Sequence, residues 1–256
     1  MRITFLGSGT SQGIPVIGSH HPVCLSKDSK DKRLRASVYV ETDSLKLIID
    51  CGPDFRTQIL RENISDLEAI LFTHEHSDHT AGLDDIRQFT LKDGALPIYA
   101  HQRVLTNLEK RFDYIFDKSI IYKGKPEVIP NTIENSPFYI NNQKIIPIDM
   151  LHGELQTFGF RIDDFAYLTD VSFIPKKEKE KLQNLKILIV DTLQIRPHPT
   201  HFNLEDSLDL IKELKPERTY FTHISHKLGF HEKVQKSLPK NVFLGYDGLK
   251  LKTTVC

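Results

Sequence analysis

The segment 74–79, with the sequence His-Glu-His-Ser-Asp-His, constrains the fold of this chain more than any other feature. It follows the apolar run 69–72, which predicts a buried strand that ends where the segment begins. Side chains two positions apart on a strand point to the same side, so His74 and His76 leave the strand in one direction. Imidazole and carboxylate are ligands of zinc- and manganese-like ions. The spacing favours two ions, one at the first two histidines and one at the closing aspartate and histidine, over a polar loop with surface histidines.

Composition limits the class of protein. The 256 residues are 39% hydrophobic, which suffices for one large core, and we expect a single domain over residues 1–256. Basic and acidic residues number 34 each, whereas a protein that grips long nucleic acid usually carries a basic excess. We expect no membrane span and no signal peptide. The odd set of Cys24, Cys51 and Cys256 predicts no disulfide framework, and we therefore expect a cytoplasmic protein.

Apolar segments predict strands in both halves of the chain. In the first half the predicted strands cover residues 2–6, 36–41, 45–50, 69–73 and 97–100. In the second half they cover 137–140, 143–148, 157–162, 165–169, 186–190, 219–222 and 242–246, and the last two are expected to close the chain. Predicted helices include 83–91, 102–111 and 204–214. This order predicts an α/β fold of two halves that pack sheet on sheet, with helices outside.

Three further residues of metal-ligand type, His152, Asp170 and His223, stand where predicted strands end. Functional groups of layered α/β folds gather at such edges, so the three residues are expected to join the ligand segment. One ion would then have three histidine ligands, and the second would have one aspartate and two histidines. The proposed ligands are His74, His76 and His152 for the first ion, Asp78, His79 and His223 for the second, with Asp170 as the bridge. A hydroxide between ions about 4 Å apart is a nucleophile near neutral pH.

The order H-x-H-x-D-H, then His, Asp and His, resembles that of the metallo-β-lactamase superfamily. The resemblance runs along nearly the whole chain and implies an αβ/βα four-layer sandwich with a di-metal site at the sheet edges. The segments 4–15, 169–172 and 222–226 are similar to the PhnP-type branch, phosphodiesterases that act on five-membered cyclic ribose phosphates.

The resemblance also implies roles for residues outside the ligand set. His201 matches a histidine of the branch that acts on the leaving oxygen or the phosphate, with His226 as a less favoured proton donor. Asp78 and His201 are therefore the candidate catalytic residues. Asp50 ends a buried strand beneath the ligand segment and is expected to orient a histidine by a hydrogen bond.

A third metal site is implied near the first loop. In the branch, cysteines of this loop and the histidine of H-I-S-H bind a structural zinc. Cys24 and His226 occupy matching positions, whereas Ser19 and His21 stand where cysteines are expected. Zinc accepts nitrogen and sulfur together, so His21, Cys24 and His226, with His20 as a further ligand, form a candidate zinc site. The alternative is that these are ordinary loop residues.

Together these observations predict a di-metal hydrolase with zinc or manganese. We expect a phosphodiesterase that cleaves a small cyclic or nucleotide-like phosphodiester by attack of a hydroxide between the ions. The alternatives are a ribonuclease-Z-like or other nuclease, a hydrolase of another ester, thioester or lactam, and a metal-binding scaffold or sensor without catalysis. A small phosphodiester is the expected partner, nucleic acid and membrane are disfavoured, and a homodimer is compatible with the sequence.

Overall fold

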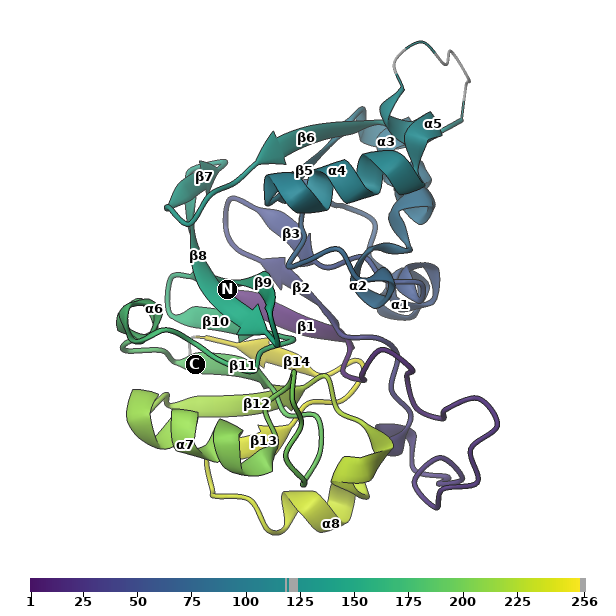
Figure 1. Cartoon of the computed structure of the whole chain (residues 1–256). Coiled ribbons are helices and arrows are strands. Elements are labelled where there is room, and N and C mark those ends of the chain that lie inside the picture. Colours follow the sequence, from purple (N-terminus) through teal and green to yellow (C-terminus); the bar gives the residue numbers. More distant parts are fainter. Residues whose placement is uncertain (118, 120–123, 254–256) are drawn as a thin grey trace.

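Two sheets stacked face to face, with helices on both outer sides, form the chain (Figure 1). This computed structural model describes residues 1–117, 119 and 124–253. Each sheet has seven strands among the described residues, and each is mixed. The α/β four-layer sandwich expected from the sequence is confirmed. Cys24 and Cys51 are buried free thiols, and Cys256 lies outside the described residues.

The first sheet carries the ligand segment. Its strand order is β14-β1-β2-β3-β4-β5-β6. The strands are β1 (Arg2–Gly7), β2 (Ser37–Glu41), β3 (Lys46–Ile49), β4 (Ala69–Leu71), β5 (Leu96–Ala100), β6 (Val128–Thr132) and β14 (Lys250–Lys252). The helices of this half are α1 (Phe55–Glu62), α2 (Ser77–Thr80), α3 (Arg87–Asp93), α4 (Gln102–Arg111) and α5 (Asp113–Phe116), with short 3-10 helices at Ser29–Asp31 and Leu83–Ile86. Strands β3 to β6 pair in parallel, and residues 47–49 of β3 and the whole of β4 are apolar, as buried parallel strands usually are.

The second sheet supplies the remaining candidate ligands. Its order is β13-β12-β11-β10-β9-β8-β7, with parallel pairing from β10 to β13 and antiparallel pairing from β7 to β10. The strands are β7 (Phe138–Ile140), β8 (Gln143–His152), β9 (Leu155–Ile162), β10 (Phe165–Leu168), β11 (Ile187–Asp191), β12 (Arg218–Thr222) and β13 (Val242–Leu244). The helices are α6 (Lys176–Glu180), α7 (Leu204–Leu214) and α8 (His231–Gln235), with a 3-10 helix at His226–Leu228.

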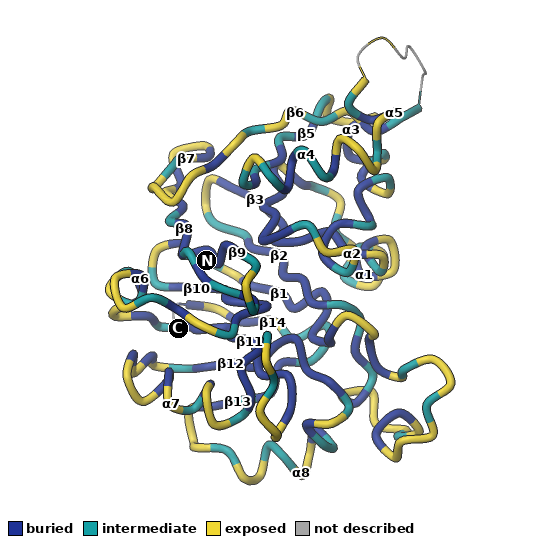
Figure 2. The backbone as a smooth tube through the Cα atoms, viewed as in Figure 1, coloured by how far each residue is buried: buried dark blue, intermediate teal, exposed yellow. Residues whose placement is uncertain are grey.

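The main core lies between the two sheets, and strands β10 and β11 of the second sheet are buried along their whole length (Figure 2). Large aromatic side chains from both sheets fill it. They are Phe5, Phe158, Phe160, Phe165 and Tyr167, each at most 2% exposed. Alternate residues of β9 face this core, as the two-residue period of a strand requires. Two further apolar clusters lie between the sheets and the outer helices, so both faces of each sheet are covered.

Helix α7 fixes the end of the loop that carries His201. The Asn203 side chain accepts hydrogen bonds from the backbone N–H groups of Glu205 and Asp206, at 2.7 and 3.2 Å. The Asp206 carboxylate accepts in return from the Asn203 N–H at 3.1 Å, which completes a capping box. This sequence-local cap sets where the loop meets the helix.

The structure corrects three expectations. The strand 242–246 does not close the chain, because β14 follows and pairs with β1, with Leu251 opposite Ile3. The predicted helix 83–91 divides into a 3-10 turn and α3. The predicted strand 143–148 extends to His152, because β8 keeps pairing with β9 along its whole length. Over the described residues, no helix combines the length and apolar character needed to cross a bilayer.

Candidate metal centre

Three histidines from both halves of the chain form the first candidate ligand group. His74 and His76 follow β4, and His152 ends β8. The ring centroids of His74 and His76 are 4.5 Å apart, and that of His152 lies 5.7 and 5.3 Å from them. One nitrogen from each ring lies within 4.8 Å of the others, so the structure brings together the three residues predicted for the first ion.

The second group contains two carboxylates and two histidines. His79 Nε2 lies 3.0 Å from an Asp78 oxygen and 3.1 Å from an Asp170 oxygen. His223 Nε2 lies 3.3 Å from the other Asp170 oxygen. That same oxygen is 4.0 Å from His152 Nε2, so Asp170 stands between the two groups, where the sequence placed the bridging ligand.

The backbone conformation directs three of the side chains into the cluster of candidate ligands. Asp50, Asp170 and His223 each lie just after a strand and have φ angles of 66°, 51° and 54°. Positive φ is uncommon outside glycine, and such residues concentrate at functional sites. The strained turns therefore mark the edge of the sheets at which the side chains converge.

The unpartnered nitrogens in the cluster fit metal binding. His74 Nε2, His79 Nε2 and His223 Nε2 are buried and have no hydrogen-bond partner, although carboxylate oxygens lie close to two of them. Buried polar atoms are rarely left unsatisfied in proteins. Imidazole nitrogens and carboxylate oxygens converge there. These are the ligand atoms that zinc- and manganese-like divalent ions prefer. The residues present therefore fit two ions.

The electrostatics of the cluster favour a bound positive charge. Burial lowers the pKa of His79, but the three carboxylates around it outweigh burial and raise that pKa well above 6.5. Burial would raise the pKa of Asp170, but His223 and His79 hold it well below its usual range. Burial lowers the pKa of His74, which leaves its imidazole neutral, the form that coordinates a metal.

Asp50 orients the ligand segment, which confirms its expected role. One Asp50 oxygen lies 2.7 Å from Nδ1 of His79, so the His79 N–H donates there and Nε2 faces the cluster. The other oxygen accepts the Thr73 backbone N–H at 2.9 Å. The Thr73 hydroxyl lies 3.0 Å from Nδ1 of His74, which ties the two histidines to one buried carboxylate.

His201 stands against both ligand groups. Its ring centroid is 4.4 Å from that of His152 and 4.8 Å from that of His223. Asp191 accepts a hydrogen bond from His201 Nδ1 at 2.7 Å. Burial lowers the pKa of His201, but the Asp191 carboxylate raises it to about 9. The sequence reasoning missed Asp191, although it ends a buried strand just as Asp50 does.

The structure brings together only part of the predicted third site. The rings of His21 and His226 lie 4.9 Å apart. The Cys24 thiol accepts the Val16 N–H at 3.5 Å. Among the described residues, the groups of three or more ligand atoms within 4.8 Å include none of His21, Cys24 and His226. The zinc at this position stays a prediction.

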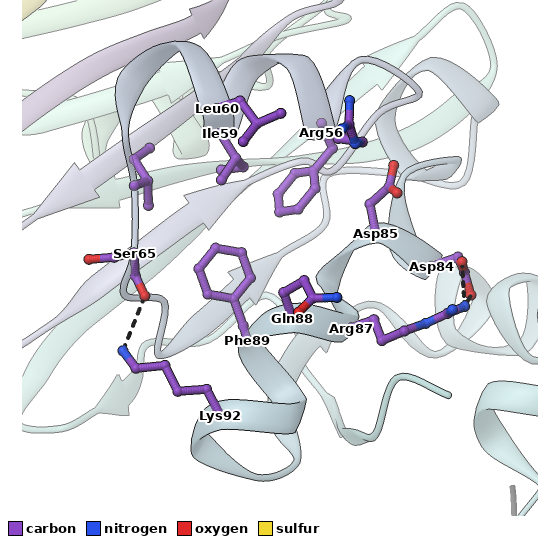
Figure 3. A pocket seen from close by; sticks show the side chains of 12 residues that line it. Arg56, Ile59, Leu60, Ser65, Asp84, Asp85, Arg87, Gln88, Phe89 and Lys92 are labelled. Atoms are coloured by element: carbon purple, nitrogen blue, oxygen red, sulfur yellow. Dashed lines mark hydrogen bonds and ion pairs between the residues drawn. The ribbon is translucent and has the colours of Figure 1, made fainter. Parts of the chain in front are cut away.

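A hollow of about 570 Å³ lies away from this cluster, between α1 and α3 (Figure 3). Phe55 and Phe89 form its floor, edge to face at 6.3 Å. Two of its cations are paired, Arg87 with Asp84 at 2.8 Å and Lys92 with Asp66 at 2.9 Å. None of the candidate ligands lines it, so it is not the site of the metal chemistry.

Comparison with known proteins agrees with this geometry. The family described as "Beta-lactamase superfamily domain" matches residues 46–224. A crystal structure described as a new diphosphatase from the PhnP family is 41% identical to this chain, covers 100% of it and 98% of its own chain, and superposes with a TM-score of 0.92.

Two curated relatives carry other names. An octanoyltransferase of Porphyromonas gingivalis is 39% identical over 98% of this chain, which spans 51% of that protein. A ribonuclease Z of Bacillus licheniformis is 28% identical over 72% of this chain, with 58% of that enzyme covered. The chain thus spans little more than half the length of these relatives. Because the superfamily domain covers most of the chain and the PhnP-family match covers all of it, the chain belongs to the metallo-β-lactamase superfamily and, within it, to the PhnP family.

Proposed function

We propose that the chain is a cytoplasmic, metal-dependent phosphodiesterase that cleaves a small cyclic or nucleotide-like phosphodiester. One observation carries this proposal: the His201–Asp191 pair stands against both ligand groups, with ring distances of 4.4 and 4.8 Å to His152 and His223. A proton donor is therefore built in beside the site where a phosphodiester would be held. The likeness to a PhnP-family diphosphatase supports chemistry at phosphorus.

The candidate ligands would be shared between two ions, zinc or manganese. His74, His76 and His152 would hold one, and the second group would hold the other, with Asp170 reaching both. When bound, the ions would lower the pKa of water to near neutral and neutralise charge on the phosphoryl oxygens. Asp78 would be a ligand of the second ion.

His201 would protonate the leaving oxygen. Asp191 accepts from Nδ1, which fixes the orientation of the ring and leaves Nε2 as the donor. The Asp191 carboxylate is fully buried and stabilises the protonated ring by its charge. A sugar alkoxide is a poor leaving group, so this proton transfer assists its departure.

A nuclease activity is the second candidate. The likeness to ribonuclease Z favours it, because it covers 72% of this chain. The zero formal net charge opposes it, since long nucleic acids are usually bound by a basic surface. The octanoyltransferase is twice as long as the matched region, so its name carries less weight for this chain.

The test is a substrate panel with protein that has been stripped of metal and reconstituted with zinc or manganese. The panel contains 2′,3′-cyclic nucleotides, a cyclic ribose phosphate, a nucleoside diphosphate, bis-p-nitrophenyl phosphate, a lactam, an octanoyl thioester and precursor tRNA. We expect metal-dependent hydrolysis of a cyclic phosphodiester, abolished in Asp170→Asn. Turnover of only the tRNA, the lactam or the thioester would overturn the proposal.

A further inference from the structure

The loop that joins β11 to α7 is attached at both ends to backbone beside candidate ligands. At its start, the Thr192 N–H donates at 3.0 Å to the carbonyl of the residue before His223. At its end, the Phe202 N–H donates at 2.6 Å to the carbonyl of the residue after Asp170. His201, the general acid proposed above, comes directly before this second contact. The loop is therefore anchored on the strand ends that carry two of the candidate ligands.

The middle of this loop, residues 195–200, has a single hydrogen bond to the rest of the described protein. We call this segment the loop tip. Four of its six residues are exposed, and the other two are half-buried. Its one hydrogen bond to a described residue outside the loop joins the Thr200 carbonyl to Nδ1 of His152, at 2.6 Å. Segments with few hydrogen bonds open most readily, so this contact has a large share in holding the tip.

The same contact orients His152 as a ligand. A carbonyl oxygen only accepts hydrogen bonds, so Nδ1 of His152 carries the proton and Nε2 keeps its lone pair. Nε2 lies 4.0 Å from an Asp170 oxygen, on the side of the candidate metal centre. Coordination at Nε2 would polarise the ring and make its Nδ1–H a stronger donor to Thr200. We therefore expect the bond between the ring and the loop tip to be strongest when an ion is bound.

Close packing beside this bond leaves no room between Thr200 and the residue after His152. Gly153 has a φ of 64°, and a Cβ at this position would lie 2.9 Å from Cγ2 of Thr200. The Gly153 N–H donates to the Ser172 hydroxyl at 2.9 Å, and this hydroxyl donates to the Leu151 carbonyl at 3.0 Å. Because the backbone of Gly153 is itself held, a side chain there would displace Thr200.

We propose that Thr200 is a positioning residue that couples the first ion to the general acid. Its carbonyl orients His152 for metal binding, and the bound ion in turn holds the loop tip, and with it His201, in place. The inference rests on the phosphodiesterase function proposed above and adds that filling of the first metal site orders the proton donor. Because coupling is reciprocal, a change at the tip weakens binding of the ion by the factor by which loss of the ion loosens the tip.

Zinc titration against a chromogenic chelator tests the effect of the loop tip on the metal. Gly153→Ala should lower the zinc affinity of the first site about tenfold, within the range for groups that support metal ligands. Thr200→Ser removes the methyl group that the new Cβ would meet and keeps the carbonyl. The double variant Gly153→Ala/Thr200→Ser should therefore bind zinc as tightly as Thr200→Ser alone.

Gly18→Ala is the matched control, because Gly18 also has a positive φ, of 72°, but a Cβ there would meet nothing within 4 Å. It should keep the zinc affinity of the wild type, and thermal unfolding checks that every variant is folded. Equal zinc affinity in Gly153→Ala and Gly18→Ala, or no recovery in the double variant, would overturn the role of Thr200.

Hydrogen–deuterium exchange tests the effect of the metal on the loop tip. In peptides that cover residues 195–200, saturating zinc should slow amide exchange about tenfold relative to chelator-treated wild-type protein, the size of one hydrogen bond to a charged group. Gly153→Ala at saturating zinc should lose most of this slowing, and Gly18→Ala should retain it. Equal exchange in the zinc-loaded and chelator-treated wild type would show that the tip is held independently of the ion and would refute the coupling.

Neither measurement requires turnover, which separates this inference from the proposed function. If no phosphodiester is hydrolysed but zinc slows exchange in the loop tip of the wild type and not of Gly153→Ala, the coupling stands and the proposed function fails. If a cyclic phosphodiester is hydrolysed but zinc leaves exchange in the tip unchanged, the function stands and the coupling fails.

Discussion

At the scale of single residues, His201 and Asp191 form the pair on which the proposed chemistry depends. His201 is buried at 9% exposure, and the carboxylate 2.7 Å away offsets the cost of placing a charged ring there. Its ring neighbours, His152 and His223, are candidate ligands from the two groups. The pair is therefore positioned for proton transfer beside the candidate ligands, with ligand atoms within 4.8 Å of those of His152, Asp170 and His223.

Replacement of His201 by alanine should lower kcat on a cyclic phosphodiester by about 10²- to 10⁴-fold, the usual contribution of a general acid. A p-nitrophenyl ester has a good leaving group, so the kcat on this substrate should fall less. Steady-state kinetics on both substrates, with metal content measured in parallel, test this. Equal losses on both substrates would assign His201 to phosphate binding, and no loss on either would exclude it from the reaction.

Replacement of Asp170 by asparagine should weaken both ions, because a neutral amide bridges two cations poorly. Elemental analysis after dialysis should show less than half of the wild-type metal content. Asp209→Asn, at an exposed aspartate of α7, is the control and should retain full content. Wild-type metal content in Asp170→Asn would contradict the bridging role.

Most of the candidate ligands were predictable because their spacing is local or because they end apolar strands. His74, His76, Asp78 and His79 are adjacent in sequence, and the structure adds only their convergence with distant residues. Asp191 was missed because a lone aspartate after a strand is common, and only the fold shows that it meets His201. The grouping of His21 with Cys24 depended on loop geometry, which the sequence does not determine.

At the scale of secondary-structure elements, helix α4 holds the ligand segment in place. Arg103 of α4 donates to both oxygens of Glu75, at 2.9 and 3.1 Å, and to the Gln156 carbonyl of β9 at 2.6 Å. Arg111, about two turns further along α4, donates to the Thr80 hydroxyl, which itself donates to the His76 carbonyl at 2.8 Å. The helix thus fixes the backbone between two ligands.

Arg103→Met should lower metal affinity about tenfold, the lower end of the range for groups that support metal ligands. Its effect on the free energy of unfolding should be small, about 1 kcal/mol, because the Arg103 side chain is 36% exposed and the pair is partly screened. A double-mutant cycle with Glu75→Gln, read by metal titration, tests the coupling. If the loss of metal affinity in the double variant equals the sum of the losses in the two single variants, Arg103 and Glu75 do not act as a unit.

Elements with strong periodicity were predicted well, and exposed edge strands were not. The predicted helices 102–111 and 204–214 coincide with α4 and α7, because each has a clear apolar stripe. β6 was missed because its residues are at most half-buried and include Pro130, so no strand pattern appears. β14 is three residues long and pairs with the other end of the chain, a contact that local sequence does not encode.

At the scale of the whole molecule, a buried arginine joins the first loop to the last strands. Arg33 is 3% exposed and donates to the Ser8 hydroxyl at 2.8 Å and to the Gly245 carbonyl at 2.5 Å. It also donates to Nδ1 of His231 at 3.1 Å, and the His231 backbone N–H donates to Asp31 at 2.7 Å. Segments from both ends of the chain are thus connected through one guanidinium group.

This contact predicts how stability depends on pH. Burial and the charge of Arg33 lower the pKa of His231 from 6.5 to about 4. Above pH 6.5 the ring is neutral in both states. As the pH falls from 6.5 towards 4, the unfolded chain binds a proton that the folded chain does not, so stability is lost, by about 2 kcal/mol at pH 5.

His231→Gln isolates this effect, because glutamine does not titrate. Urea unfolding of the wild type and the variant at pH 7.5 and pH 5 should show the wild type losing about 2 kcal/mol more than the variant over this interval. Parallel losses in the two proteins would mean that His231 is protonated in the folded state.

The candidate ligands come from both halves of the chain, with His74 to His79 on one side and His152, Asp170 and His223 on the other. The binding site therefore exists only while the two halves are docked, and thermodynamic linkage makes metal affinity part of the folding equilibrium. At a free metal concentration 100-fold above Kd, one ion adds about 2.7 kcal/mol, or roughly 5–10 °C in Tm for a chain of this size. Chelation should lower Tm by at least that amount in wild-type protein and by less in Asp170→Asn, and an unchanged Tm after metal loss would mean that the halves associate independently of the ions.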